Sequence, residues 1–167
     1  MARREHPSET LATSFLRRNN VSFTQHLYDY VEHGGTAESS RQLGVDEHQV
    51  IKTLVMQDEN AHPLLMLMHG DRQVSLKNLA RQIGAKSVKP CAPQAAQRHS
   101  GYQVGGTSPF GTRKNMPVYL ERSILALPKI YINGGRRGFL VGIDPQVLTN
   151  LLKAQAVETA LAESASY

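Results

Sequence analysis

Two neighbouring apolar stretches most constrain what this chain can fold into. Residues 50–57 read VIKTLVMQ and residues 64–68 read LLMLM. Successive side chains of a strand point to opposite faces, so residues 50–57, which are apolar on both, predict a strand that is covered on both sides. Pro63 introduces the second stretch, which predicts a further apolar strand. Part of the sheet is therefore expected between two packed layers.

Shorter patterns predict helices and further strands around these two. The helices are expected to begin at Ser8, Thr36, Ser75, Pro93 and Asp144, and the other strands to cover residues 21–28, 118–120, 129–133 and 138–143. The run Asn133-Gly134-Gly135 predicts the turn between the last two strands. Together the elements predict a mixed α/β (α+β) fold in one domain, residues 1–167, because no linker or repeat interrupts them.

Composition narrows the class of protein. The first ten residues, MARREHPSET, contain cations with no apolar segment after them, and the longest apolar run covers only residues 64–68. Neither a secretory signal nor a membrane span is expected. Cys91 is the single cysteine, so an internal disulfide cannot form and the cytoplasm is the expected compartment.

Charge is distributed unevenly along the chain. Residues 1–71 contain six Lys and Arg against ten Asp and Glu, whereas residues 72–140 contain twelve against Glu121 alone. A basic segment of this kind suits a polyanion, although a solvated basic surface would have the same composition. The excess coincides with a glycine loop, residues 101–115 (GYQVGGTSPFGTRKN), which favours a ligand with phosphates.

Lys52 is the first candidate for a functional residue. It lies in the middle of an apolar strand on the face of Val50, Leu54 and Met56, where a lysine is costly to bury without a partner. A lysine that extends to water would be the ordinary alternative. The central position and the few acids expected nearby favour a functional role.

The glycine loop is the second candidate. Adjacent Gly105 and Gly106 allow close backbone approach, and consecutive amides can surround a phosphate or an ester carbonyl. The loop matches neither the phosphate loop of nucleotide triphosphatases nor a dinucleotide fingerprint, and it can also be an ordinary turn. No cofactor is expected. The seven histidines lack the spacing of a metal site, so no metal is expected either.

Other groups are weaker candidates. Cys91 is more typical of an inert buried thiol, and Ser108 lacks the pattern of an esterase nucleophile. The segment 134–138, GGRRG, can contact phosphate or form a solvated hairpin tip.

Three motifs together resemble the YbaK family, which is related to the editing domain inserted in bacterial prolyl-tRNA synthetase. They are VIKTL, AQRHSGYQVGGTSPFG and IYINGGRRG, in that order, and the similarity extends from about Phe15 to the final helix. The resemblance implies a compact, largely antiparallel, barrel-like mixed sheet flanked by helices. It also implies a trans-acting aminoacyl-tRNA deacylase, with cysteine on proline tRNA as the expected substrate and a prolyl-tRNA synthetase as the candidate partner.

The resemblance also assigns expected roles to residues. Lys52 matches the lysine of the family's K-T-L strand, the stretch 105–109 its glycine loop, and Tyr28 the aromatic of the early strand. Backbone amides of Gly105, Gly106 and Thr107 would stabilise the oxyanion of ester hydrolysis, while Lys52 would anchor the terminal phosphate or ribose. Water, the neighbouring ribose hydroxyl or the substrate thiol would attack. Further expected contacts are Tyr28, Ser108, Pro109, Gly134 and Gly135 for substrate, and Arg113, Lys114, Arg136 and Arg137 for tRNA phosphates.

One departure from the family concerns an acid that often follows the hairpin. Residues 139–142, FLVG, contain none, so the role of that acid cannot be transferred. Two other functions remain open from the residues: a non-catalytic tRNA-binding or synthetase accessory module, and a small-molecule hydrolase or nucleotide binder that shares the fold. Lys52 within a strand favours the deacylase, because a docking module needs cations on its outer surface.

Overall fold

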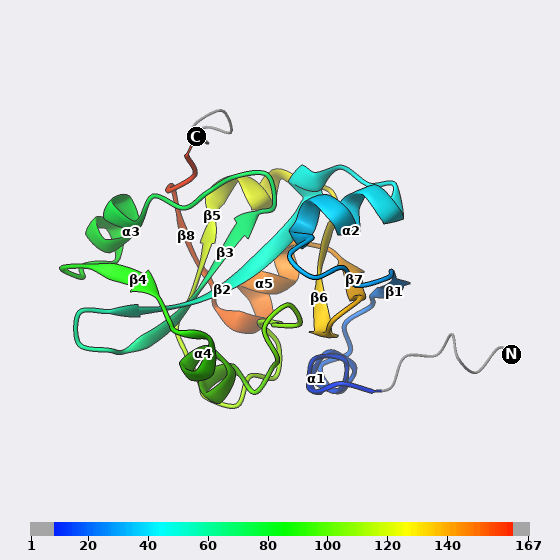
Figure 1. Cartoon of the computed structure of the whole chain (residues 1–167), viewed down its shortest axis with the longest axis horizontal. Helices are drawn as coiled ribbons and strands as arrows, with labels where there is room; N and C mark the ends of the chain where they lie inside the picture. Colours follow the sequence, from blue (N-terminus) through cyan, green and yellow to red (C-terminus); the bar gives the residue numbers. More distant parts are fainter. Residues whose placement is uncertain (1–8, 162–167) are drawn as a thin grey trace, which may run out of the picture.

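One eight-stranded mixed sheet organises residues 9–161, which are the residues that this computed structural model describes (Figure 1). In spatial order the strands are β1 (Thr24–Leu27), β7 (Phe139–Ile143), β6 (Ile130–Arg136), β2 (Val50–Asp58), β3 (Pro63–His69), β5 (Val118–Glu121) and β8 (Gln155–Val157), with β4 (Val88–Pro90) beside β2.

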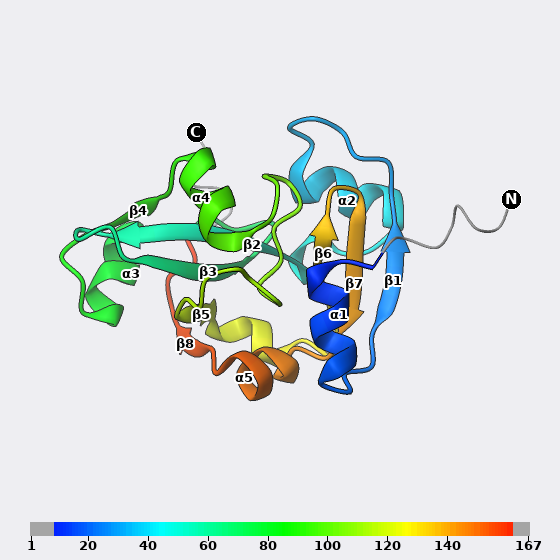
Figure 2. The same ribbon diagram turned by 90° about the horizontal axis from the view of Figure 1, so that it is seen from below.

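Both strand directions occur in this sheet. The pairs β1–β7, β6–β7, β2–β3 and β2–β4 are antiparallel, whereas β2–β6, β3–β5 and β5–β8 are parallel. Figure 2 shows β1, β7 and β6 side by side, running across the direction of the long β2–β3 pair. The expected mixed sheet flanked by helices is confirmed. Its described pairings run from β1 to β8 without joining these two end strands, so the sheet curves but stays open.

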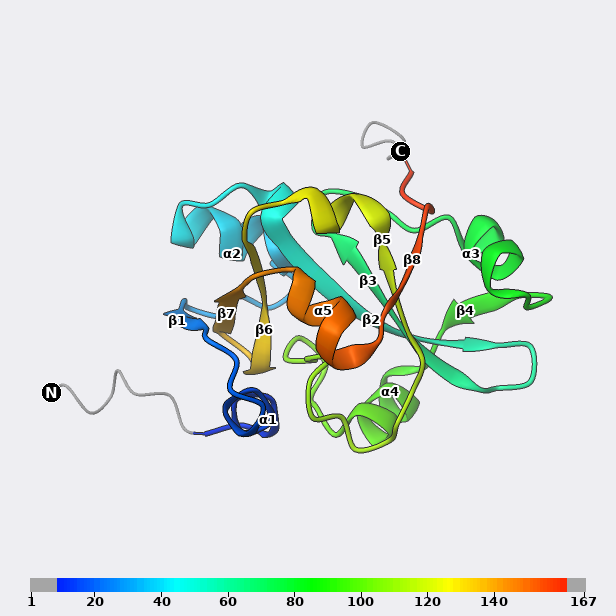
Figure 3. The ribbon, with the colours of Figure 1, turned by 180° about the vertical axis from the view of Figure 1, so that it is seen from behind.

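Five helices flank the sheet within the described residues. They are α1 (Leu11–Arg18), α2 (Gly35–Leu43), α3 (Leu76–Ile83), α4 (Pro93–Ser100) and α5 (Gln146–Leu152), with short 3-10 turns η2 (Glu47–Gln49) and η3 (Arg122–Ala126). None of them is long and apolar enough to cross a membrane. Figure 3 shows β8 lying along β5, where the chain passes α5 and approaches α3.

The β2–β3 pair has apolar clusters on both of its faces, as its sequence predicts. Ile51 and Leu67 belong to the larger cluster, which includes Phe110, whereas Met56 and Met66 belong to a second cluster with α3. Alternation of side chains along each strand separates these two sets. Burial on both faces fixes the register of the pair, because a slip by one residue would exchange its faces.

Several elements differ from the sequence-based expectations. Ser8 lies outside the described residues, and Thr10 is the N-cap of α1, with Thr13 completing the capping box. The expected turn at residues 133–135 is wrong, since β6 continues to Arg136. The side chain of Asn133 accepts hydrogen bonds from the amides of Gly135 and Arg136, which produces a bulge within the strand instead of a turn. The short strands β4 and β8 were not expected at all.

Candidate functional site

A gap in the sheet lies beside β2. One edge of β2 is paired with β3 along most of its length, so β6 and β4 share the opposite edge. There β6 pairs with Val50 and Ile51, and β4 pairs from Met56 onward. No strand of the described chain pairs with this edge at residues 52–54. At this gap the backbone N–H and C=O groups of β2 therefore have no partner among the described strands on this edge.

A cavity of about 410 Å³ lies at this gap. Segments that are distant in sequence form its wall: the β1–α2 connection with the start of α2, the start of β2, the glycine loop, and the β6–β7 hairpin. The lining residues are Tyr28, Tyr30, Val31, Glu32, His33, Gly35, Thr36, Glu38, Ser39, Val50, Ile51, Lys52, Thr53, Val104, Gly105, Thr107, Asn133, Arg137 and Leu140. The structure thus brings together five predicted site residues, namely Tyr28, Lys52, Gly105, Thr107 and Arg137.

Gly105 and Thr107 give the cavity its backbone surface. Gly105 has a φ of +90°, and a Cβ there would lie 2.8 Å from the Tyr30 hydroxyl oxygen, so only glycine fits. Its carbonyl accepts a 3.3 Å hydrogen bond from the Asn133 side-chain amide. The amides of Gly105 and Thr107 donate no hydrogen bond to the described residues. Both amides are therefore available for a ligand.

Gly106 has a different role from the one expected. Its amide donates to the carbonyl oxygen of Gln103 at 2.8 Å, so it is already used within the loop. A Cβ at Gly106 would lie 2.8 Å from the backbone of Arg136 and Arg137, which shows how closely the loop approaches the hairpin. Gly106 is buried and outside the cavity wall. We therefore correct its assignment from an oxyanion donor to a residue that allows the loop to pack on the hairpin.

Ser108 and Pro109 lie beneath the cavity wall and do not line it. Ser108 is fully buried, and its hydroxyl oxygen accepts a 3.1 Å hydrogen bond from the amide of Phe110. The Tyr102 hydroxyl donates to the carbonyl of Phe110, and burial raises the pKa of this tyrosine. These contacts hold the loop in shape, so substrate contact by Ser108 or Pro109 would require the loop to move.

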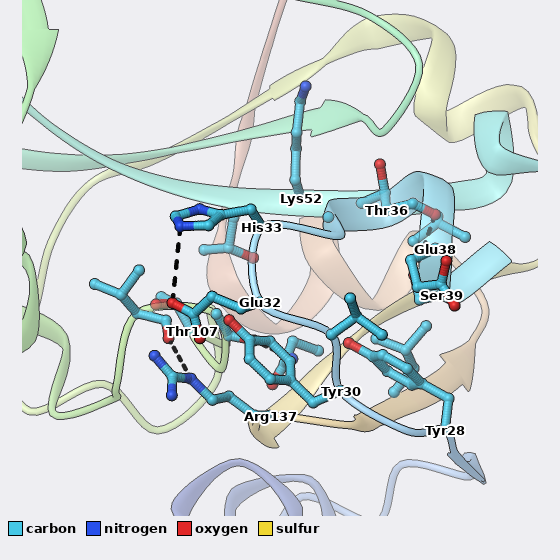
Figure 4. Close-up of a pocket in the computed structure, with 18 of the residues that line it drawn as sticks. Tyr28, Tyr30, Glu32, His33, Thr36, Glu38, Ser39, Lys52, Thr107 and Arg137 are labelled. Atoms are coloured by element: carbon cyan, nitrogen blue, oxygen red, sulfur yellow. Dashed lines mark hydrogen bonds and ion pairs between the residues drawn. The ribbon is translucent and has the colours of Figure 1, made fainter. Parts of the chain in front are cut away.

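Arg137 joins three parts of the wall. Its guanidinium lies 4.8 Å from the centre of the Tyr30 ring, and its Nε donates to the carbonyl of Val104 at 2.9 Å. Figure 4 shows Arg137 beside Tyr30 and on the same side of β2 as Thr107. Arg137 was expected to contact tRNA phosphates and not the amino acid. The structure places it in the cavity wall, with N–H groups left to bind an anion.

Lys52 lines the cavity from the other side of β2. Its ammonium points away from Thr107 and Arg137 and toward the side where the Thr36 hydroxyl lies (Figure 4). Nζ donates to the carbonyl oxygen of Gly70 at 3.5 Å, a long contact. Burial lowers the pKa of Lys52, while the charges of Glu47 and Asp71 oppose that shift. Few acids were expected near Lys52, and the structure brings the charges of two, Glu47 on η2 and Asp71 on the turn after β3, to act on it.

The remaining predicted residues lie outside the cavity wall. Gly134 packs against the Phe139 ring and accepts a hydrogen bond from the Thr10 hydroxyl, and Gly135 lies against Thr10 and Tyr102. Arg113 and Lys114 are exposed, and their backbone amides bind the end of α4. Arg136 is also exposed, with its guanidinium over the Phe139 ring. Arg113, Lys114 and Arg136 are therefore surface residues of the glycine loop and of the β6–β7 hairpin, and they are exposed to solvent.

Sequence reasoning missed most of the β1–α2 connection. Tyr30, Val31 and His33 line the cavity, although residues 29–34 show neither helix nor strand periodicity, and Thr36 joins them from the first turn of α2. The tyrosine two residues after Tyr28 and the adjacent glycines were the available signals. Asn133 was also missed, because its side chain was taken as part of a turn.

One cluster has the composition of a metal site. His48, His69 and Asp71 offer ligand atoms that all lie within 4.8 Å of one another. Three of the four ring nitrogens are engaged, however: His48 Nδ1 lies 2.9 Å from Asp71, and His69 contacts the His48 carbonyl and the Ser123 hydroxyl at 2.8 and 2.7 Å. The two rings stack with centres 3.7 Å apart. This cluster is accounted for by its own hydrogen bonds, and it braces the turn that contains Gly70.

The fold and this cavity define a class of protein. Residues 32–151, most of the chain, match the aminoacyl-tRNA editing domain, and the chain belongs to that family. The family comprises deacylases, hydrolases that act on mischarged tRNA.

Individual relatives agree with this assignment. The chain is 27% identical over 95% of its length, and 97% of the relative's, to "Putative Cys-tRNA(Pro)/Cys-tRNA(Cys) deacylase EbsC" of Enterococcus faecalis. It is 28% identical over 62% of its length to a Streptococcus equi subsp. zooepidemicus proline–tRNA ligase, of which the match covers 17%. A structure described as "a putative trans-editing enzyme for prolyl tRNA synthetase" shares the fold, with a TM-score of 0.79, 21% identity, and coverage of 91% of this chain and 96% of that one.

Proposed function

We propose that this protein removes amino acids from mischarged tRNA in trans, with cysteine on proline tRNA as its main substrate and with the cavity beside β2 as the active site. Membership of the editing family supports the reaction, and the similarity to EbsC supports the substrate. The observation that carries the proposal is the cavity itself, where two unpaired amides and two cations surround an open strand edge.

The backbone amides would stabilise the transition state. Hydrolysis of the aminoacyl ester builds negative charge on the carbonyl oxygen, and oriented N–H groups lower the free energy of that charge. The amides of Gly105 and Thr107 take this role, whereas the amide of Gly106 is excluded by its bond to Gln103. The φ of +90° at Gly105 fixes the orientation of the two neighbouring peptide groups.

The two cations would position the 3′ end of the tRNA. Lys52 and Arg137 line the cavity from opposite sides of β2, so an RNA backbone that crosses the open edge would meet both (Figure 4). Arg137 can bind phosphate through two N–H groups, whereas Lys52 offers a compact charge. The ring of Tyr28 adds an apolar wall against which the terminal ribose or base can pack. Arg113, Lys114 and Arg136 would contact phosphates farther along the acceptor arm.

The attacking group would come from solvent or substrate. Ser39 is the serine in the cavity wall, and its hydroxyl donates to the carbonyl of Thr36 within α2, with no histidine as partner. An acyl-enzyme route therefore has no activated nucleophile among the lining residues. Water adds to the ester carbonyl and loses a proton, and the bond to the ribose oxygen breaks as that oxygen takes a proton. The cysteine thiol would instead leave the tRNA as a cyclic thiolactone, whereas attack by the neighbouring ribose hydroxyl only moves the ester to the other ribose oxygen, so that water must still complete the release.

A substrate panel tests the proposal. Purified protein is incubated with Cys-tRNA, Ala-tRNA and Pro-tRNA made on proline tRNA, and with Cys-tRNA on cysteine tRNA, and loss of each ester is followed against buffer. We expect the largest acceleration for cysteine on proline tRNA and little for proline. A proline–tRNA ligase is the proposed partner, and its addition is expected to improve discrimination between the two tRNAs. Binding of all four without accelerated hydrolysis would favour the accessory module instead.

A further inference from the structure

The ammonium of Lys52 lies in a small polar compartment at one end of the cavity. Its hydrogen bond within the described residues goes to the carbonyl oxygen of Gly70, at 3.5 Å. Gly70 is packed so tightly against Thr36 that a Cβ at Gly70 would lie 2.4 Å from the Thr36 hydroxyl oxygen. The amide of Gly70 donates to the Val50 carbonyl at 2.6 Å, which ties the compartment to β2. Gly70 is therefore a neighbour of both Lys52 and Thr36.

Glu47 lies next to Thr36. The Thr36 hydroxyl donates to its carboxylate at 2.7 Å, and Thr36 is the residue that links Glu47 to the cavity wall. Glu47 belongs to η2, the turn that leads directly into β2, so its backbone is held close to the strand that carries Lys52. The Thr36 hydroxyl is thus the donor that orients the Glu47 carboxylate.

Asp71 is the second acid that faces Lys52, but its charge is shared. Its carboxylate oxygens lie 2.9 Å from Nδ1 of His48 and 3.5 Å from the Arg72 guanidinium. No cation among the described residues, Lys52 included, forms an ion pair with Glu47, so its charge acts on the Lys52 ammonium from a longer distance. Of the charged groups on the elements around Lys52, Glu47 on η2 therefore has the charge that is most available to the ammonium, ahead of Asp71 on the turn after β3.

We propose that the Thr36–Glu47 pair is a positioning device for Lys52, which keeps its ammonium charged and directed to the cavity end where the tRNA backbone enters. This inference rests on the proposed role of Lys52 in deacylation. Thr36 acts through Glu47, since its hydroxyl orients the carboxylate, and Glu47 acts through Lys52. Neither residue needs to touch the ester.

The electrostatics agree with this arrangement. Burial lowers the pKa of Lys52, and Glu47 is the larger of the two charges that raise it again. A lysine whose pKa falls loses its charge as the pH rises through that lower value. Removal of the Glu47 charge must therefore shift the loss of the ammonium to lower pH. The reaction would be affected on its alkaline side and spared at lower pH.

The first experiment measures the charge of Lys52 without any substrate. Lysine Cε resonances of 13C-labelled protein are titrated by NMR, and the signal absent from Lys52→Arg identifies Lys52. Glu47→Gln is expected to lower its pKa, because a negative charge that favours the ammonium is removed. Thr36→Val is expected to lower it less and Thr36→Ser to leave it near the wild-type value. Glu158→Gln, far away beside Arg122, is the control. An unchanged Lys52 pKa in Glu47→Gln overturns the proposal.

The second experiment links this charge to the reaction. The alkaline limb of the kcat/KM profile on Cys-tRNA is expected to move to lower pH in Glu47→Gln, by the same amount as the NMR titration, and activity at the acidic end should stay within about threefold. Thr36→Val added to Glu47→Gln should cause no further shift, because Thr36 acts through Glu47. A shifted titration with an unshifted rate profile would overturn the role in the reaction. If wild-type protein deacylates no tRNA, the proposed function fails while the NMR result still decides the charge relationship.

Discussion

Lys52 is held half-buried between the carbonyl of Gly70 and the charge of Glu47, in the middle of an otherwise apolar strand. Its three N–H groups are served in the described structure by a single long hydrogen bond. A buried ammonium with unused donors is unfavourable in the free protein and favourable once an anion enters. This asymmetry is the physical reason to assign Lys52 to substrate binding.

Replacement of Lys52 by alanine is therefore expected to lower deacylation by about a hundredfold or more, because a group that positions the substrate is lost. The fold should persist, since Lys52 is only half-buried and makes a single long hydrogen bond within the described residues. Single-turnover rates with Cys-tRNA, together with circular dichroism, measure both effects. Near-normal turnover by a folded variant would remove Lys52 from the mechanism.

Gly105 separates a backbone mechanism from a side-chain mechanism. Gly105→Ala introduces a methyl group at a φ of +90° and 2.8 Å from the Tyr30 hydroxyl, so both amides of the loop should shift. We expect a loss of turnover of about a hundredfold, the usual effect of an impaired oxyanion donor. Ser108→Ala should instead cost about 1–3 kcal/mol of stability by leaving the Phe110 amide without its partner.

The comparison needs variants that are folded at the assay temperature, because Gly105→Ala also strains the backbone. Cys91→Ala is a second control: burial raises the pKa of this thiol, which disfavours the reactive thiolate. Loss of activity in Ser108→Ala or Cys91→Ala with a tolerated Gly105→Ala would point to a covalent acyl-enzyme route.

At the scale of elements, the β6–β7 hairpin and the glycine loop form one wall. Arg137 contacts Val104 and Tyr30, and Gly106 allows the loop backbone to reach the hairpin. Exposed Arg113, Lys114 and Arg136 border the same wall without entering the cavity. The hairpin therefore combines a cation inside the site with another on the surface.

This division predicts two kinds of effect for the cations. Alanine at Arg113, Lys114 or Arg136 should weaken tRNA binding and reduce the slope of log Kd against log salt by roughly one for each true phosphate contact. Turnover at saturating tRNA should change little. Arg137→Ala should lower kcat as well, because it also releases Tyr30 and Val104. Equal salt slopes for wild type and the three surface variants would assign these cations to the solvated surface.

Local sequence patterns correctly predicted the features that depend on a single helix or strand. Local periodicity and backbone chemistry predict the covered strand 50–57, the caps Ser75 and Gly84, and the helix that begins at Pro93. It failed where distant contacts compete with local preference. Asn133 and the glycines after it favour a turn, yet hydrogen bonds of the Asn133 side chain and packing on Phe139 keep them in β6.

The cavity was predictable only in part, for the same reason. Lys52 and Gly105 stand out in the sequence, because a buried cation and adjacent glycines are locally unusual. Tyr30 and Thr36 gain their roles only when the β1–α2 connection folds over the gap beside β2, and Gly106 loses its expected role through a bond to Gln103. These roles depend on contacts between segments that are distant in sequence, and no local sequence pattern predicts such contacts.

At the scale of the whole molecule, the C-terminal segment closes the sheet edge opposite β1. β8 pairs with β5, and Glu121, which is buried, accepts a 2.7 Å hydrogen bond from the amide of Thr159. Val74 and Ala160 form a further bridge. These contacts lie far from the cavity, so they affect stability and not the reaction.

Glu121→Ala is accordingly expected to reduce the free energy of unfolding by about 1–3 kcal/mol, since a buried amide loses its acceptor. Urea unfolding followed by circular dichroism measures the loss. Glu158→Ala, which removes only an exposed ion pair with Arg122, serves as the matched control and should have little effect. A larger loss in the control than in Glu121→Ala would contradict this view of the C-terminal anchor.

The most direct test of the whole account is the single-turnover rate of Cys-tRNA hydrolysis on proline tRNA, measured with tRNA binding for wild type and Lys52→Ala. We expect strong acceleration over buffer by wild type, and a loss of about a hundredfold in Lys52→Ala with binding largely retained through the surface cations. Binding without acceleration by the wild-type protein, or equal rates for the two proteins, would contradict the claim that the cavity beside β2 hydrolyses the ester.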